Sequence, residues 1–168
     1  MPTKPEVVIY TDGACEPTNP GPGGYAALVV SGENRREITG GYRLTTNNRM
    51  EIMAAIAGLK SLEGKQTVSI YTDSKYLADS IMLGWAKSWR GKGWMRNKKE
   101  KASNSDLWAR LLGLCEQHEV QFFWVRGHAG HVENEQCDSL AVEAAKMAGL
   151  PPDVGFEEGL REPQMDLL

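Results

Sequence analysis

The sequence is poor in cysteine and lacks long hydrophobic runs, and each absence excludes a class of protein. Its 168 residues include three cysteines, Cys15, Cys115 and Cys137, with no CxxC spacing. This odd, unpaired set argues against a disulfide-stapled domain and favours a reducing, cytoplasmic setting. No apolar run approaches the ~20 residues of a membrane span, and no basic-then-apolar stretch opens the chain. We therefore expect one cytoplasmic globular domain that is not inserted in a membrane.

A nucleotide-phosphate loop of the GxxxxGK[ST] type is also absent, so the GPGG at 21–24 is interpreted as a turn. Acidic residues outnumber basic ones only slightly, and the net charge is −3. The charge is unevenly distributed, because residues 85–102 carry a local charge of +6 and the remaining chain carries −9. This basic segment, which also contains tryptophans, favours a nucleic-acid partner, with a merely solvated basic face as the alternative.

Hydrophobic patterning predicts an α/β fold. Strands are expected at residues 7–10, 25–30, 36–44, 67–73 and 120–125, and helices at 48–62, 74–83, 103–118 and 133–147. Gly13 is expected to end the first strand. This order predicts a mixed five-stranded sheet, an antiparallel meander plus parallel crossover strands, flanked by helices. Residues 1–148 are expected to form the domain, and the acidic residues 149–168 a poorly ordered tail that adds little to the core.

Two predicted strands end in the same tripeptide, Tyr-Thr-Asp, at Asp12 and at Asp73. Ends of central strands are where α/β folds place their chemistry, and the two carboxylates lie side by side if the strands are neighbours. Glu51, in the first turn of a buried helix, and Asp138, on the last helix, could reach the same point. Carboxylates gathered this closely need a proton or a cation between them, and hard oxygen ligands suit Mg²⁺ or Mn²⁺.

Each carboxylate also has a purely structural explanation. Asp12 could form an Asx-turn, and Asp73 could cap the helix that follows it. Asn48 and Glu51 could form a capping box, and Asp138 could lie at the solvated margin of an apolar stripe. All four together, beside a basic aromatic segment, favour phosphodiester chemistry, in which two divalent ions about 4 Å apart activate a water and stabilise the leaving oxygen.

Six motifs occur in a characteristic order: TDGACEPTNPGPGGYAA, TTNNRMEIMAAI, YTDSKYL, the basic arm at 85–101, NSDLW and WVRGHAGHVENEQCDSLA. In order and spacing they resemble bacterial ribonuclease H, type 1, from about residue 7 to residue 148. The resemblance implies a ribonuclease H-like fold and a monomeric endonuclease. Such an enzyme cleaves the RNA strand of an RNA–DNA hybrid and leaves 5′-phosphate and 3′-hydroxyl ends. It also implies Mg²⁺ as cofactor, with two ions per active site when substrate is bound and Mn²⁺ as a substitute.

The same resemblance implies roles for individual residues. The metal ligands would be Asp12, Glu51, Asp73 and Asp138, with Asp12 bridging both ions, and His128 would assist proton transfer and product release. The hybrid's minor groove would be contacted by Cys15, Asn19, Asn47 and Asn48, and a DNA-strand phosphate by Thr46 and Asn104. The DNA strand would be gripped by Trp85, Trp89, Arg90, Lys92, Lys98, Lys99 and Lys101.

The chain departs from the family's pattern at three places. Lys75 stands where relatives often have Gln, which makes one substrate contact cationic. Leu44 stands where they often have a basic residue, and Arg43, one place earlier in a strand, points to the other face. Cys15 and Asn19 are separated by three residues instead of two. These departures concern substrate contacts and not the chemistry.

Three other functions remain open at this stage. A module that binds hybrids without cutting them would not need all four carboxylates. An enzyme of similar fold acting on other nucleic acids fits the asparagines and the arm less well. A structural zinc site would draw on Cys115, His118, His128, His131 and Cys137, although their spacing contains no tight ligand pair.

Overall fold

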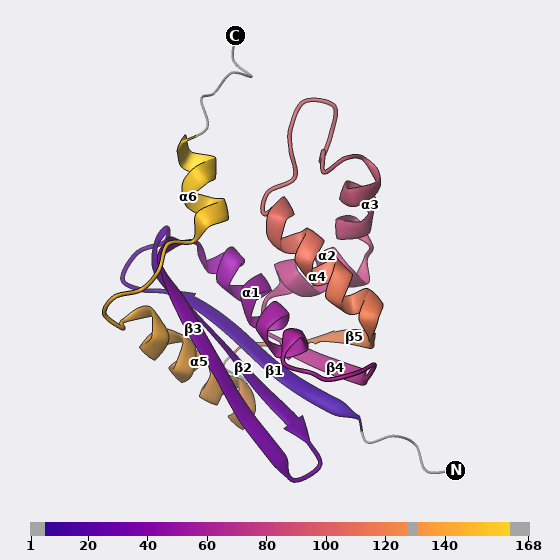
Figure 1. Cartoon of the computed structure of the whole chain (residues 1–168), viewed down its shortest axis with the longest axis vertical. Helices are drawn as coiled ribbons and strands as arrows, with labels where there is room; N and C mark the ends of the chain where they lie inside the picture. Colours follow the sequence, from indigo (N-terminus) through magenta and orange to yellow (C-terminus); the bar gives the residue numbers. More distant parts are fainter. Residues whose placement is uncertain (1–5, 128–130, 162–168) are drawn as a thin grey trace.

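The computed structural model describes residues 6–127 and 131–161, and it contains one mixed sheet (Figure 1). The strands are β1 (Val7–Cys15), β2 (Gly21–Ser31), β3 (Asn34–Thr45), β4 (Thr67–Thr72) and β5 (Glu119–Trp124). Their order in the sheet is β3-β2-β1-β4-β5. The β1–β2 and β2–β3 pairs are antiparallel, whereas β1–β4 and β4–β5 are parallel. The predicted meander followed by crossover strands is confirmed.

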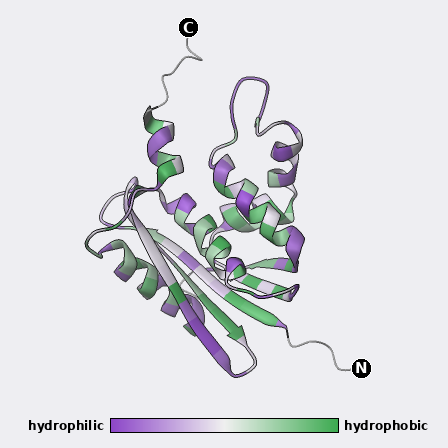
Figure 2. Cartoon of the chain, in the orientation of Figure 1, coloured by the Kyte–Doolittle hydropathy of each residue, from purple (hydrophilic) through white to green (hydrophobic). Residues whose placement is uncertain are grey.

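Helices cover both faces of this sheet (Figure 1). One face carries α1 (Asn47–Lys60), α2 (Lys75–Met82), α3 (Trp85–Gly91) and α4 (Ser105–Gln117), and the other carries α5 (Val132–Ala145). The larger core lies between α1, α4 and the central strands, and it includes Ile9, Ile56 and Trp108. Figure 2 shows the hydrophilic hairpin end of β3, at the sheet's outer edge. None of the helices in the described ranges has the length and apolarity needed to cross a membrane.

The prediction that Gly13 ends the first strand is wrong. β1 continues to Cys15, and Gly13 pairs with Tyr25 of β2 within the ladder. A Cβ atom at position 13 would lie 2.5 Å from the backbone nitrogen of Glu51. Glycine is therefore required here because the backbone of α1 comes close to the strand, and not because the strand stops.

The observed helix caps rule out two of the purely structural explanations. Helix α1 begins one residue earlier than expected, and its N-cap is Thr46, whose hydroxyl oxygen accepts from the backbone N–H of Arg49 at 3.2 Å. Helix α2 is capped by Ser74, whose hydroxyl oxygen accepts from the Leu77 N–H at 3.1 Å. Glu51 and Asp73 are consequently not used as capping groups, so their carboxylates need another explanation.

The segment from Gly149 to Arg161 differs from the predicted poorly ordered tail. Its first part runs along the outer edge of β3, where the carbonyl of Pro151 accepts from the Arg43 N–H at 2.9 Å. Asp153 is buried, and a further helix, α6 (Val154–Arg161), follows it. The amino-acid composition of this segment does not predict the arrangement, because it depends on one specific ion pair between Asp153 and the buried Arg49. The domain boundary after residue 148 stays a prediction.

Candidate active site

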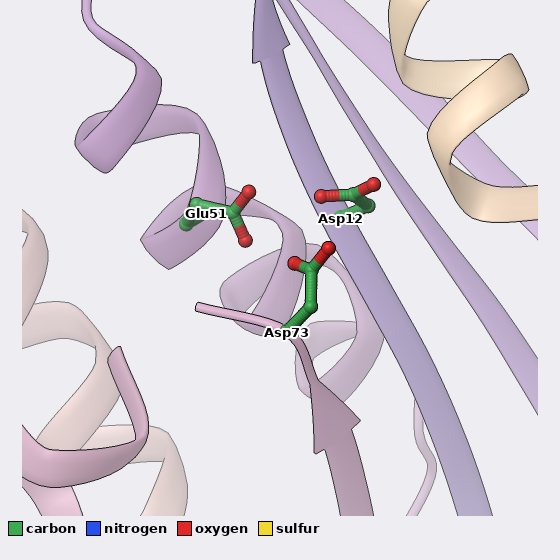
Figure 3. Close-up of side chains that lie close together, drawn as sticks. All are labelled: Asp12, Glu51 and Asp73. Atoms are coloured by element: carbon green, nitrogen blue, oxygen red, sulfur yellow. The ribbon is translucent and has the colours of Figure 1, made fainter. Parts of the chain in front are cut away.

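Three of the four predicted carboxylates converge at one edge of the sheet. Asp12 lies near the end of β1, Asp73 directly follows β4, and Glu51 projects from α1 (Figure 3). Carboxylate oxygens of the three lie within 4.8 Å of one another. The parallel register explains the first two, since Thr11 pairs with Thr72 and the next residue on each strand is the aspartate. The two Tyr-Thr-Asp strands are neighbours, so the condition under which their carboxylates lie side by side is met.

The backbone of Gly13 ties two of these carboxylates together. Its N–H donates to Asp12 Oδ1 at 2.8 Å and to Glu51 Oε1 at 3.0 Å. Glu51 is only 3% exposed, and its second oxygen, Oε2, has no hydrogen-bond partner within the described part of the chain. A buried carboxylate oxygen without a donor is costly, so this atom points to a ligand that binds oxygen.

The electrostatics of the cluster favour the same conclusion. Burial, followed by the charges of Asp73 and Asp138, raises the pKa of Asp12 to about 7. Burial and the charge of Asp12 raise the pKa of Glu51 well above its ordinary value. A divalent cation removes the need for these protons, and oxygen donors of this kind suit Mg²⁺ or Mn²⁺. The residues present therefore fit a metal site.

Asp138 reaches the same cavity from the opposite layer. The cavity has a volume of about 600 Å³, and the four predicted carboxylates line it. Asp138 is half-buried on α5 and is not one of the three whose oxygens lie within 4.8 Å of one another. Helix α5 can come this close because Gly24 has no side chain, since a Cβ atom there would lie 2.1 Å from the carbonyl oxygen of Ala141.

Most of the residues predicted to contact the minor groove lie around this cavity. Cys15, Asn47 and Asn48 line it, as does Lys75. Asn19 is exposed, and its side-chain oxygen accepts from the Asn47 N–H at 3.0 Å. Burial raises the pKa of the Cys15 thiol to about 11, so this side chain is neutral at physiological pH.

The two residues predicted to hold a DNA-strand phosphate are joined by a residue that the sequence patterns did not single out. Arg49 is 3% exposed, and its side chain donates to Asn104 Oδ1 at 3.4 Å, while its backbone N–H donates to Thr46. Asp106 and Asp153 balance its charge. The available signal was an arginine inside a helix that is otherwise apolar nearly all round.

The basic arm lies away from the carboxylates. It comprises α3 and residues 92–101, closed by a bridge between Met95 and Lys101. Arg90 pairs with Glu116 at 2.7 Å, and Arg96 pairs with Glu100. Among the described residues no ion pair involves Lys87, Lys92, Lys98, Lys99 or Lys101. These lysines, all of them exposed, are therefore available to phosphates.

The tryptophans of the arm have different environments. Trp89 packs against the buried Trp108, with ring centroids 6.3 Å apart, so it anchors the arm to the core. Trp85 is 45% exposed and presents a ring to solvent. His128 lies outside the described residues, and its role stays a prediction.

A zinc site receives no support within residues 6–127 and 131–161. The one group of three or more metal-binding side chains found there is the carboxylate cluster. His118 Nδ1 already accepts from the Gln66 N–H at 3.0 Å, and the Cys137 thiol donates to the Tyr10 carbonyl at 3.3 Å. Burial raises the pKa of Cys137 to about 12, which disfavours the thiolate that zinc requires.

Comparisons with known proteins identify the family of the chain. The family model described as RNase H matches residues 4–146. A curated protein named Ribonuclease H from Trichodesmium erythraeum is 57% identical over 152 residues, covering 90% of this chain and 96% of that protein.

Solved structures share the fold. LC9-RNase H1, described as a type 1 RNase H with the type 2 active-site motif, superposes with a TM-score of 0.75 at 32% identity, over 96% of this chain and 83% of that one. LC11-RNase H1, solved in complex with RNA/DNA hybrid, has a TM-score of 0.64 at 21% identity, over 83% and 96% of the two chains. The motifs, the sheet order and the converging carboxylates thus have one common explanation: the chain belongs to the RNase H family, as a bacterial type 1 member.

Proposed function

We propose that the chain is an endonuclease that hydrolyses the RNA strand of RNA–DNA hybrids and leaves 5′-phosphate and 3′-hydroxyl ends. One observation supports this proposal above all others. Three carboxylates from β1, α1 and the end of β4 converge with oxygens within 4.8 Å of one another, and the buried Glu51 Oε2 has no hydrogen-bond partner within the described residues. Family membership supplies the reaction class that fits such a cluster.

The proposed ligands of the metal are Asp12, Glu51, Asp73 and Asp138. We propose Mg²⁺, replaceable by Mn²⁺, with two ions present when substrate is bound. Bound divalent ions supply an activated water and stabilise the charge on the leaving oxygen. The Gly13 N–H holds Asp12 and Glu51 in place, which keeps the ligand atoms ordered before substrate arrives. We further propose that His128 moves a proton near the scissile bond and that the chain acts as a cytoplasmic monomer.

Substrate choice is proposed to depend on ribose 2′-hydroxyls. Asn47, Asn48 and Cys15 line the cavity beside the carboxylates, and Asn19 is bonded to Asn47. These neutral donors and acceptors suit hydroxyls displayed in a wide minor groove. An all-DNA duplex lacks those hydroxyls, and the second strand of an all-RNA duplex should fit the arm poorly.

We expect labelled RNA–DNA hybrid to be cleaved with Mg²⁺ and to stay intact with EDTA. DNA–DNA should not be cut, and RNA–RNA should be cut far more slowly. Electrophoresis of the end-labelled strands, with all duplexes of one sequence, measures this directly. Binding without cleavage would support the hybrid-binding module instead, and comparable cutting of DNA–DNA would refute the proposed recognition.

A second test concerns the arm. Replacing Lys98, Lys99 and Lys101 with Ala should weaken hybrid binding and lower the log–log slope of affinity against salt by roughly one unit for each phosphate that is no longer neutralised. Turnover at saturating hybrid should change little, since these side chains lie outside the carboxylate cavity. The matched control replaces three exposed lysines outside the arm, Lys60, Lys65 and Lys146. Equal salt slopes for the two triple variants would show that the arm does not meet phosphate.

A further inference from the structure

The C-terminal segment lies beside β3 (Figure 1). Its Asp153 contacts Arg49, the residue that joins Thr46 and Asn104. The Arg49 guanidinium donates from Nε to Asp153 Oδ2 at 2.8 Å and from Nη2 to Asp153 Oδ1 at 2.9 Å. It also donates to both oxygens of Asp106, at 2.8 and 2.7 Å, and to Asn104 Oδ1 at 3.4 Å. A guanidinium has five N–H donors, and these contacts use all of them.

Because all five N–H donors of its guanidinium are already used, Arg49 has no donor left for a ligand. A guanidinium that has no spare donor and two neighbouring carboxylates is not the group that binds a substrate phosphate. The same saturation fixes its orientation, since each donor has a defined acceptor. Arg49 is therefore suited to holding other side chains in place.

Asn104 is held from both ends. Its oxygen accepts from Arg49, and its amide nitrogen donates to the Tyr76 hydroxyl at 3.2 Å. Its backbone has a φ of 63°, a left-handed conformation in which Asn is enriched. Asn104 keeps one amide N–H without a partner in the described ranges, and the hydrogen of the Thr46 hydroxyl is likewise unpaired there. Two neutral donors beside the N-terminus of the 14-residue α1 suit an anion.

We propose that Asp153 is a positioning residue for the DNA-strand phosphate, acting through Arg49 on Asn104. This inference rests on the proposed function. Asp153 accepts from two donors of the buried Arg49 and also from the Thr45 hydroxyl at 2.7 Å, directly before Thr46. Without its carboxylate, the guanidinium turns toward Asp106 and water and no longer holds the Asn104 oxygen. The acidic C-terminal segment therefore contributes to substrate affinity.

The test measures kcat and KM for hybrid cleavage by the full chain, well below the melting temperature of every variant. Asp153→Asn should raise KM by up to about 10-fold, the scale of one hydrogen bond, and leave kcat unchanged. Asp153→Glu keeps the charge but moves the carboxylate by one methylene, so it should raise KM less and preserve the fold. Glu157→Gln, a control in the same segment, weakens the ion pair with Arg43 and should leave KM unchanged.

A double-variant cycle separates positioning from a merely structural role. Asn104→Ala should raise KM, and adding Asp153→Asn to it should raise KM no further, although it still lowers Tm. In the unaltered chain, one methylphosphonate in the DNA strand, at the contacted phosphate, should raise KM. In the Asp153→Asn variant, the same methylphosphonate should raise KM by a smaller factor.

Three outcomes would overturn the inference. Lower Tm with unchanged KM in both Asp153 variants would show a structural role alone. Additive KM changes in the cycle would show that Asp153 does not act through Asn104. Absence of hybrid cleavage by the unaltered chain would overturn the proposed function and this inference with it. Normal cleavage by the unaltered chain, together with either of the first two results, would overturn this inference alone.

Discussion

Asp12→Asn is expected to reduce hybrid cleavage by at least about 10³-fold, because a charged metal ligand accounts for several kcal/mol of transition-state stabilisation. Asp12 shares the Gly13 N–H with Glu51, and its carboxylate lies close to those of Glu51 and Asp73 (Figure 3). Single-turnover cleavage with Mg²⁺ measures the effect. The control is Asp79→Asn, which removes one charge on α2 outside the cavity. Near-normal turnover in Asp12→Asn would refute the metal site.

The same substitution should stabilise the metal-free protein. The pKa of Asp12 is raised to about 7 by burial and then by the charges of Asp73 and Asp138. The folded chain therefore binds more protons than the unfolded chain between about pH 4 and pH 7, and its free energy of unfolding falls as pH rises through that window. At pH 8 in EDTA, Asp12→Asn should gain about 1–3 kcal/mol, since one pKa unit is worth about 1.4 kcal/mol and partial hydration reduces the sum.

Thermal melts in EDTA at pH 5 and pH 8 test this expectation. The Tm difference between Asp12→Asn and the unaltered chain should be larger at pH 8, because at pH 5 the aspartic acid is already protonated. Saturating Mg²⁺ should raise the Tm of the unaltered chain more than that of the variant. A difference that does not change between the two pH values would mean that burial and the neighbouring charges do not raise the pKa of Asp12.

Arg49→Met should have the largest effect on stability. Burial alone would lower the pKa of Arg49, but hydrogen bonds and charge attraction from Asp106 and Asp153 raise it. Removing the cation leaves the buried Asp153 uncompensated, and breaking such a pair typically costs about 3–5 kcal/mol. For a chain of this size that corresponds to a fall in Tm of roughly 10 °C.

Arg43→Met is the matched control for this stability loss. It removes an arginine that also pairs with the C-terminal segment, through Glu157 at 2.8 Å, but whose side chain is largely exposed. Solvent screens such a pair, so the change in Tm should be much smaller. Urea unfolding of both variants provides the comparison. Equal losses for Arg43→Met and Arg49→Met would show that burial of the Arg49 network adds nothing.

The sequence alone was sufficient to predict the sheet and the pair of aspartates at its edge, because both depend on local patterns. Alternating and apolar runs mark strands wherever they occur, and a repeated Tyr-Thr-Asp places two carboxylates alike once the strands are neighbours. The role of Asp153 could not be read in this way. Its partner Arg49 is 104 residues away, and nothing near either residue indicates the other.

Gly13 shows a second limit of local patterns. Beside Asp12 it has the signature of a turn, which led to the wrong strand end. Glycine is required at position 13 because α1 comes close to the strand there. This tertiary contact with Glu51 cannot be predicted from the residues adjacent to Gly13. The caps at Thr46 and Ser74 were missed for a related reason, since several polar residues in each stretch could have served.

The glycines at 13 and 24 also determine how closely two helices approach the carboxylate site. Each brings a helix backbone against the sheet, α1 with Glu51 on one face and α5 with Asp138 on the other. The main-chain contacts at Gly13 and Gly24 therefore hold carboxylates from opposite layers at one cavity. A larger residue at either position would push a whole helix, and the carboxylate that it carries, away from the sheet.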